Sequence, residues 1–248
     1  MERVALIVFA RAPKAGTTKT RLAAVIGDHL ASAFHAVCLR DLINIQAMLG
    51  AKLRSDNQRP LELDTYFFHP PEDQLAEFAR AGVNLPPDIH SAVQTGDDLG
   101  QRMAHAIQTV LDGSPEGTRC LLIGSDCPLL EPDDLVAAVN ALDNADVVVG
   151  PTHDGGYYMI GMAKPRPGLF TISDWGGPTV LEQTKTKAQQ AGLTLAEVET
   201  LPDVDTAEDL EQVTLHPRLP KLEDREAVRL CQVLALQATN QSDKITSN

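Results

Sequence analysis

The chain has 248 residues, an apolar content of 43% and a formal net charge of −13. The length suits one α/β domain, or one domain with an appendage, and the apolar content is ordinary for a globular protein with a real core. The excess of acidic residues argues against nucleic acid or an anionic membrane surface as a partner, because both repel negative charge.

Cysteine spacing and hydropathy narrow the class further. The four cysteines form no CxxC pair and have no zinc-type spacing, so we expect reduced thiols. The N-terminal apolar run at residues 4–10 lacks a cleavage-site pattern, and no run approaches the roughly 18 apolar residues of a membrane span. We therefore expect a cytoplasmic protein without a membrane span.

The first predicted strand, residues 4–10, leads into a basic loop at residues 11–22 with the sequence RAPKAGTTKTRL. Four basic side chains just before a helix favour an anion site, because backbone N–H groups and the helix dipole attract negative charge there. A solvated basic turn is the alternative. The loop is not a P-loop, since the glycines of that pattern would fall on Pro13 and Thr18.

The next segments alternate between predicted helices and strands. His29 and His35 are expected on the surface of the second helix. The predicted elements are helices at 18–26 and 28–49, a loop at 51–60, a strand at 61–68, a helix at 72–80 and a strand at 89–93.

A glycine-containing loop, QTGDDLGQRM at residues 94–103, opens the next helix. Asp97 or Asp98 can cap that helix through its carboxylate. Gly96 before the cap and Arg102 after it indicate a loop that lets a ligand approach the backbone.

The central predicted strand, residues 120–123, is a short apolar run that stops at Gly124, and Pro128, which lacks a backbone donor, ends the sheet ladder just beyond it. Asp126 follows directly, at the carboxyl end where open α/β sheets bind ligands. A carboxylate there can hold a divalent cation. The alternatives are that Asp126 tightens a turn or caps the helix that begins near Pro132. Cys127 is expected to be a small packed residue rather than a nucleophile, because no histidine partner is evident.

A hairpin is predicted late in the chain, where Asp154, Gly155 and Gly156 separate two apolar runs. A loop with the single tryptophan, Trp175, follows. Beyond it we expect a helix at 179–191, a strand at 193–198, a helix at 207–213 capped by Thr206, a last helix at 224–237 and a disordered tail from residue 239.

The alternation of strands and helices predicts an α/β fold: a three-layer α/β/α, Rossmann-like domain whose sheet is mostly parallel with one antiparallel strand. We expect this domain at residues 1–216 and the C-terminal helix and tail at 217–248.

Four motifs resemble the GT-A fold of nucleotide-diphospho-sugar transferases, and more narrowly the radical-SAM/selenodomain-associated bacterial transferases. Thr18 stands where that family is expected to have valine. The motifs are FARAPKAGTTKTRL at 9–22, QTGDDLGQRM at 94–103, IGSDCPLL at 123–130 with GPTHDGGYYMIG at 150–161, and PDVDTAEDL at 202–210.

The resemblance implies roles for individual residues. Asp126 and Asp205 would share one Mg²⁺ or Mn²⁺ ion, and their like charges would repel each other without it. Lys19 and Asp154 would be catalytic, Asp154 as the acceptor base. The nucleotide and phosphate would contact Arg11, Ala12, Pro13, Gly16, Lys19, Arg21, Gly96, Asp98 and Arg102, and the sugar or acceptor would face Gly155, Gly156, Tyr157 and Trp175.

Three functions follow from these features. The first is a metal-dependent glycosyltransferase that uses a nucleotide-diphospho-sugar and a small-molecule acceptor. The second is a nucleotidylyltransferase that joins an NTP to a phosphorylated small molecule and releases pyrophosphate. The third is a nucleotide-binding module without turnover, for which the basic loop alone would suffice.

Overall fold

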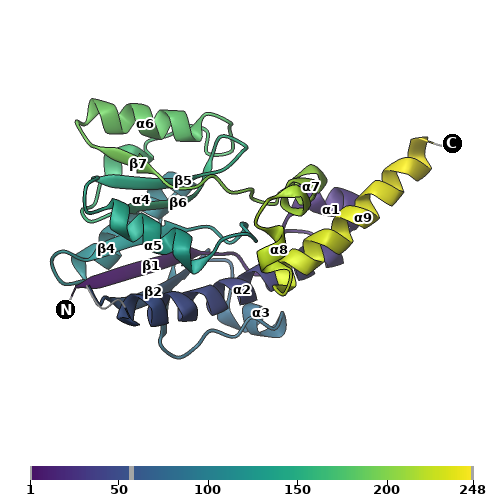
Figure 1. Cartoon of the computed structure of the whole chain (residues 1–248), viewed down its shortest axis with the longest axis horizontal. Helices are drawn as coiled ribbons and strands as arrows, with labels where there is room; N and C mark the ends of the chain where they lie inside the picture. The colour runs from purple at the N-terminus through teal and green to yellow at the C-terminus, as the bar shows by residue number, and fades with distance from the viewer. Residues whose placement is uncertain (1, 56–58, 247–248) are drawn as a thin grey trace.

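The computed structural model describes residues 2–55 and 59–246, with residues 240–246 described by their backbone alone. A seven-stranded sheet forms its centre, in the order β3-β2-β1-β4-β6-β5-β7 (Figure 1). Strand β6 runs antiparallel to both of its neighbours, and the other pairs are parallel. The strands are β1 (Arg3–Phe9), β2 (Glu62–His69), β3 (Ile89–Val93), β4 (Arg119–Ile123), β5 (Val147–Pro151), β6 (Tyr157–Met162) and β7 (Leu195–Glu197).

Helices cover both faces of the sheet, which confirms the predicted three-layer α/β class. The helices are α1 (Thr20–Ile26), α2 (Asp28–Ser55), α3 (Leu75–Arg80), α4 (Leu99–Asp112), α5 (Pro132–Ala141), the 3-10 helix η1 (Pro167–Phe170), α6 (Val180–Gln190), α7 (Ala207–Leu215), α8 (Leu219–Leu222) and α9 (Glu226–Thr246).

Alternation along the strands divides the apolar core into two layers. Val4, Leu6 and Val8 of β1 pack with α2, α5 and α9 on one face. The intervening residues of β1, Ala5 and Ile7, pack with α4, η1 and α6 on the other. Successive side chains of a strand point to opposite faces, so the continuous apolar run of β1 follows from burial on both sides.

Two helices are longer than the sequence predicts. Helix α2 continues to Ser55, through part of the predicted loop, because Leu49 and Leu53 extend its buried face by one more turn. Helix α9 continues to Thr246, past residue 239, where we expected a disordered tail. Within the described ranges, no helix is both long and apolar enough to cross a membrane.

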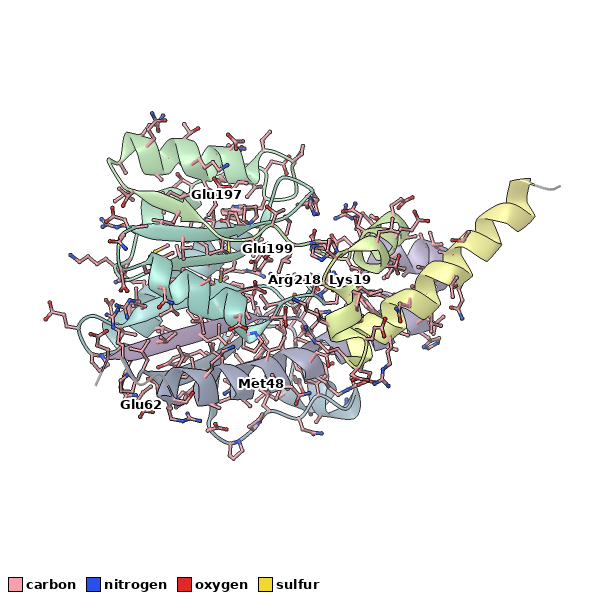
Figure 2. The ribbon with its side chains drawn as sticks, viewed as in Figure 1. Lys19, Met48, Glu62, Glu197, Glu199 and Arg218 are labelled. Atoms are coloured by element: carbon pink, nitrogen blue, oxygen red, sulfur yellow. The ribbon has the colours of Figure 1, made fainter. Side chains whose placement is uncertain are left out.

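Hydrogen bonds from two arginines connect the C-terminal helices to residues 129–134, which follow β4. Arg218, which Figure 2 labels beside α8, donates to both carboxylate oxygens of Asp134 at 2.7 Å and to the Leu129 carbonyl at 3.2 Å. Arg225 donates to the Leu130 carbonyl at 2.6 Å. Such paired, charge-assisted hydrogen bonds fix geometry. They therefore hold the loop that carries Asp126 in place.

Candidate functional site

The candidate site lies where β1 and β4 end. These strands are parallel neighbours, with Val8 opposite Ile123, so the loops that follow them leave the sheet at the same edge. The Val204 N–H donates to the Asp126 carbonyl at 2.9 Å. This bond brings the segment before α7, which contains Asp205, beside the end of β4.

The basic loop after β1 is held by Thr18, which belongs to the loop, and by Asp73 from the segment that follows β2. The Thr18 hydroxyl donates to the Ala12 carbonyl at 3.0 Å and accepts from the Lys14 N–H at 3.1 Å. Asp73 accepts from the Ala12 N–H at 2.6 Å and from the Lys14 ammonium at 2.8 Å. Thr18, the departure from the expected valine, therefore ties the loop together, and the Lys14 ammonium is paired with Asp73.

A cavity of about 580 Å³ opens at this edge. The expected charged residues of three separate segments meet in it. Its polar and charged lining consists of Arg11, Thr17, Thr18, Lys19, Thr20, Arg21, His35, Gln94, Arg102, Ser125, Asp126 and Asp205.

The Lys19 ammonium lies between the two carboxylates. Its Nζ is 2.9 Å from Asp126 Oδ1 and 2.8 Å from Asp205 Oδ1, and its side chain is only 4% exposed. Figure 2 labels Lys19 where the sheet meets α1 and α7. Arg21 pairs with the second carboxylate oxygen of Asp205. The two carboxylates are therefore bridged by a cation and do not confront each other as unscreened like charges.

Burial and charge act in opposite directions on this cluster. Burial disfavours the charged form of Lys19, but the charges of Asp126 and Asp205 outweigh it and raise the pKa of the ammonium. Burial also disfavours ionised Asp126, but the Lys19 charge and then His35 lower the pKa of that carboxyl well below its usual range. Both groups are therefore ionised at neutral pH.

His35 corrects a prediction, because it is buried rather than at the helix surface. Its side chain is 2% exposed and lines the cavity. The Nε2 atom lies 3.0 Å from the Arg11 carbonyl, and Nδ1 lies 3.5 Å from Asp126 Oδ1 without a hydrogen bond. The signal was its spacing: Ala31 and Cys38, one helical turn on either side, are both on the buried face of α2.

The second glycine loop lines the cavity through Gln94, Leu99 and Arg102, whereas its Gly96 and Asp98 hold other groups of the loop in place. Asp98 caps α4 by accepting from the Gln101 N–H at 2.7 Å, and the Gly96 carbonyl accepts from Arg102 Nε at 3.0 Å. Arg102 itself lines the cavity. Among the described residues, the predicted phosphate contacts Ala12, Pro13, Gly16, Gly96 and Asp98 lie outside that lining.

The predicted hairpin joins β5 to β6, with Asp154 in its turn. Asp154 Oδ1 accepts from the Gly156 N–H at 2.9 Å and from the Thr152 hydroxyl at 2.5 Å. Gly155 has φ +89°, and a Cβ there would lie 2.0 Å from the Pro178 carbonyl oxygen. The turn is therefore packed tightly against the loop that follows Trp175, and of the described residues that line the cavity none belongs to this hairpin.

Tyr157 and Trp175, two of the residues predicted to face the sugar or acceptor, form an aromatic cluster with Phe170. Tyr157 and Trp175 pack edge to face, with ring centroids 6.4 Å apart, and Trp175 stacks on Phe170. A Cβ on Gly100 would lie 2.6 Å from Trp175 Nε1. The N-terminus of α4 therefore packs directly on the Trp175 loop.

Asp203 is a partly buried carboxyl near Asp205 and Asp154 to which the sequence assigned no role. Burial, reinforced by the charges of Asp154 and Asp205, raises its pKa from 3.8 to about 7. The carboxyl thus exchanges its proton near neutral pH. The only sequence signal was its place two residues before Asp205 in the motif PDVDTAEDL.

This shift predicts a pH-dependent effect of Asp203→Asn. Between about pH 4 and pH 7 the folded chain keeps a proton that the unfolded chain has released, so wild-type stability falls with rising pH until the folded pKa. The variant cannot lose stability in this way. At pH 8 its free energy of unfolding should therefore exceed that of wild type by about 1–2 kcal/mol, a figure reduced for partial exposure, and near pH 4 the two should be equal. Urea unfolding in EDTA at both pH values measures it. An equal difference at both would show that Asp203 does not titrate this way.

Asp126 and Asp205 suit a hard divalent cation by their chemistry. Mg²⁺ takes one or two carboxylates together with phosphate oxygens. Both side chains are partly exposed, at 39% and 36%. Among the described residues no group of three histidine, cysteine or acidic side chains is arranged to hold a metal. A two-carboxylate site completed by phosphate is thus the arrangement that these residues fit.

Comparison with known proteins identifies relatives of the whole fold. Residues 56–177 match the family described as "Uncharacterized protein conserved in bacteria (DUF2064)". A crystal structure of a "putative nucleotide-diphospho-sugar transferase" from Desulfovibrio desulfuricans G20 is similar with a TM-score of 0.82 and 28% identity, covering 97% of this chain and 98% of that one. No curated protein matches the sequence.

Two more distant structures share the fold alone. A 4-diphosphocytidyl-2C-methyl-D-erythritol synthase from Anaerococcus prevotii DSM 20548 has a TM-score of 0.51 at 10% identity, covering 84% of this chain and 94% of that one. A CMP:2-keto-3-deoxy-manno-octonic acid synthetase complexed with CTP has a TM-score of 0.50 at 10% identity, covering 85% and 96%. The chain therefore matches the DUF2064 family over residues 56–177 and shares its fold with a nucleotide-diphospho-sugar transferase structure over nearly its whole length.

Proposed function

We propose that this protein is a metal-dependent glycosyltransferase that uses a nucleotide-diphospho-sugar. One observation carries the proposal: Lys19, at the end of the loop after β1, and Arg21, in the first turn of α1, meet Asp126 and Asp205 in a single cavity. Its volume of about 580 Å³ lies within the roughly 300–1,000 Å³ of small-molecule sites. The similarity to the Desulfovibrio structure over nearly the whole chain supports the same substrate class.

The basic and acidic residues of the cavity would have different roles. Lys19 and Arg21 would bind the diphosphate, because they are cations at the cavity wall and α1 begins next to Lys19. Asp126 and Asp205 would hold the metal ion, and the bound ion would offset the charge that develops on the leaving diphosphate. Arg102, held by the Gly96 carbonyl, would contribute a further cation at the opposite loop.

Asp154 is the proposed acceptor base, and its Oδ1 is already held by the Gly156 N–H and the Thr152 hydroxyl. These two donors would fix the carboxylate while Oδ2 takes the acceptor proton. Asp154→Asn should lower kcat by about 100-fold or more, the usual contribution of general base catalysis. Nucleotide affinity should not change, because Asp154 lies outside the cavity lining. Steady-state kinetics with a calorimetric titration separates the two quantities, and an unaltered kcat would remove Asp154 from the mechanism.

Nucleotidyl transfer is the second candidate. Within the described part of the chain, four cationic side chains line the cavity: Arg11, Lys19, Arg21 and Arg102. This number suits a triphosphate, whose three phosphates carry more charge than a diphospho-sugar. In that reaction Lys19 and Arg21 would stabilise the triphosphate, and pyrophosphate would leave.

A thermal-shift screen tests the proposal and separates the candidates. A ligand that binds only the folded chain raises Tm by mass action. The protein is heated with NTPs and with nucleotide-diphospho-sugars, each with Mg²⁺, Mn²⁺ or EDTA. A larger, metal-dependent shift with a diphospho-sugar is expected. A preference for an NTP would favour nucleotidyl transfer, and shifts that are the same in EDTA would favour a binding module without metal chemistry.

A further inference from the structure

The Lys19 side chain lies where a cation shared by Asp126 and Asp205 would be placed. Its Nζ is within 2.9 Å of one Oδ1 atom and 2.8 Å of the other, so those two oxygens are separated by no more than the sum of these distances. Arg21 holds the remaining oxygen of Asp205. Both carboxylates are therefore already paired with cations of the chain itself.

The backbone holds Lys19 in this position at an energetic cost. Lys19 has φ 53° and ψ 46°, in the left-handed region, and among the described residues it is the only one other than glycine with a positive φ. A non-glycine residue persists in such a conformation when its surroundings require it, and such residues concentrate at functional sites. At Lys19 the requirement is the placement of the ammonium, since its side chain is 4% exposed and bridges two acids.

Electrostatics makes this arrangement unfavourable for a second cation. A divalent ion that approached Asp126 and Asp205 would come close to the ammonium of Lys19 and the guanidinium of Arg21, and their repulsion would oppose its binding. A bound phosphate group would remove this repulsion. Lys19 and Arg21 both line the cavity, so a bound diphosphate offers them alternative anionic partners and leaves the carboxylates to the metal.

We propose that Lys19 and Arg21 are resident counter-ions that keep a divalent cation off Asp126 and Asp205 until phosphate binds. This inference rests on the metal site of the proposed function and adds a rule for when that site fills. Because coupling between two ligands is reciprocal, phosphate then raises metal affinity and metal raises phosphate affinity by the same factor. The metal ion is thereby taken up with substrate and released with product.

The test measures Mn²⁺ binding, not activity. Mn²⁺ alone is titrated by calorimetry into the wild-type chain and into Lys19→Met, which keeps the aliphatic stem but not the charge. The inference predicts that Lys19→Met binds Mn²⁺ more tightly than wild type by on the order of tenfold. Lys14→Met is the matched control: Lys14 belongs to the same loop, but it pairs with Asp73 and Glu77, each at 2.8 Å. Its Mn²⁺ affinity should equal that of wild type.

A second titration uses only the wild-type chain, so the inference stays testable if Lys19→Met does not fold. Mn²⁺ is titrated with and without UDP as a phosphate-bearing probe, and UDP should tighten Mn²⁺ binding by on the order of tenfold beyond the affinity of Mn²⁺ for free UDP. Equal Mn²⁺ affinity in wild type and Lys19→Met, or no effect of UDP, would overturn the counter-ion role while the metal site stands. Mn²⁺ binding that is absent in every case would overturn both the inference and the proposed metal dependence.

Discussion

Asp126→Asn is expected to abolish metal-dependent nucleotide binding. Asp126 lies at the carboxyl end of β4, and its carboxylate is the part of the proposed cation site closest to the central strand. The amide keeps the shape of the side chain but loses the negative charge that a divalent cation needs. In calorimetry, nucleotide affinity with Mn²⁺ should fall to the value that wild type shows in EDTA.

The same substitution should also destabilise the empty protein. From the sequence alone, removal of one acid was expected to relieve repulsion between Asp126 and Asp205. The structure reverses that expectation, because the nearly buried Lys19 ammonium bridges them and would lose one partner at 2.9 Å. Loss of a partner from a buried charge costs about 1–3 kcal/mol. Urea unfolding in EDTA measures this loss, and a more stable variant would show that the bridge does not form.

Asp205→Asn and the double variant Asp126→Asn/Asp205→Asn test whether the two acids hold the same ion. If both acids hold one ion, either substitution alone removes it, and the double variant should bind metal little worse than either single variant. If instead each acid acts alone, the losses in free energy should add. A double-mutant cycle on Mn²⁺-dependent nucleotide binding distinguishes the two.

Lys19→Ala and Arg21→Ala are each expected to weaken nucleotide binding by about 1.5–3 kcal/mol, the range for hydrogen bonds to charged groups. Both side chains line the cavity: Lys19 is the residue just before α1, and Arg21 lies in the first turn of that helix. Arg21 is the cleaner case, because its side chain is 68% exposed and its loss leaves little buried charge unpaired. Calorimetric titration of the best nucleotide from the thermal-shift screen measures both.

Lys14→Ala is the matched control for these two variants. It removes a positive charge from the loop that leads into α1, but the Lys14 ammonium is paired with Asp73 and Glu77. Nucleotide affinity should therefore stay within a few tenths of a kcal/mol of wild type. A loss as large as that of Arg21→Ala would mean that the net charge of the loop, and not the placement of Arg21, governs binding.

Strand composition was enough to predict the fold and the sheet edge at which the candidate site lies. The apolar run of β4 followed by Gly124 and Pro128 predicts a buried strand that ends just before Asp126, and the hairpin residues Gly155 and Gly156 predict the antiparallel strand β6. These patterns are local, so they can be recognised in the sequence without knowing which other segments the strands pair with.

The contacts inside the site could not be predicted in the same way. That Lys19 reaches Asp205 depends on the Val204 N–H bond to the Asp126 carbonyl, between segments far apart in the chain. His35 has the helical spacing of a buried residue, but its polarity predicts a surface position. The sequence does not show that the Arg11 carbonyl lies beside its Nε2 and provides the buried ring with a polar partner. The pKa of Asp203 depends on burial by segments that the sequence does not place together.

The most direct test of the shared phosphate and metal site is a calorimetric titration of the preferred nucleotide into wild type and Asp126→Asn, each with Mn²⁺ and with EDTA. We expect wild type to bind at least about tenfold more tightly with Mn²⁺ than with EDTA, since one lost charge-assisted contact already costs about 1.5 kcal/mol or more. Asp126→Asn should bind equally weakly in both buffers. Wild-type affinity that is the same with Mn²⁺ and EDTA, or a variant that keeps the full metal effect, would contradict the account.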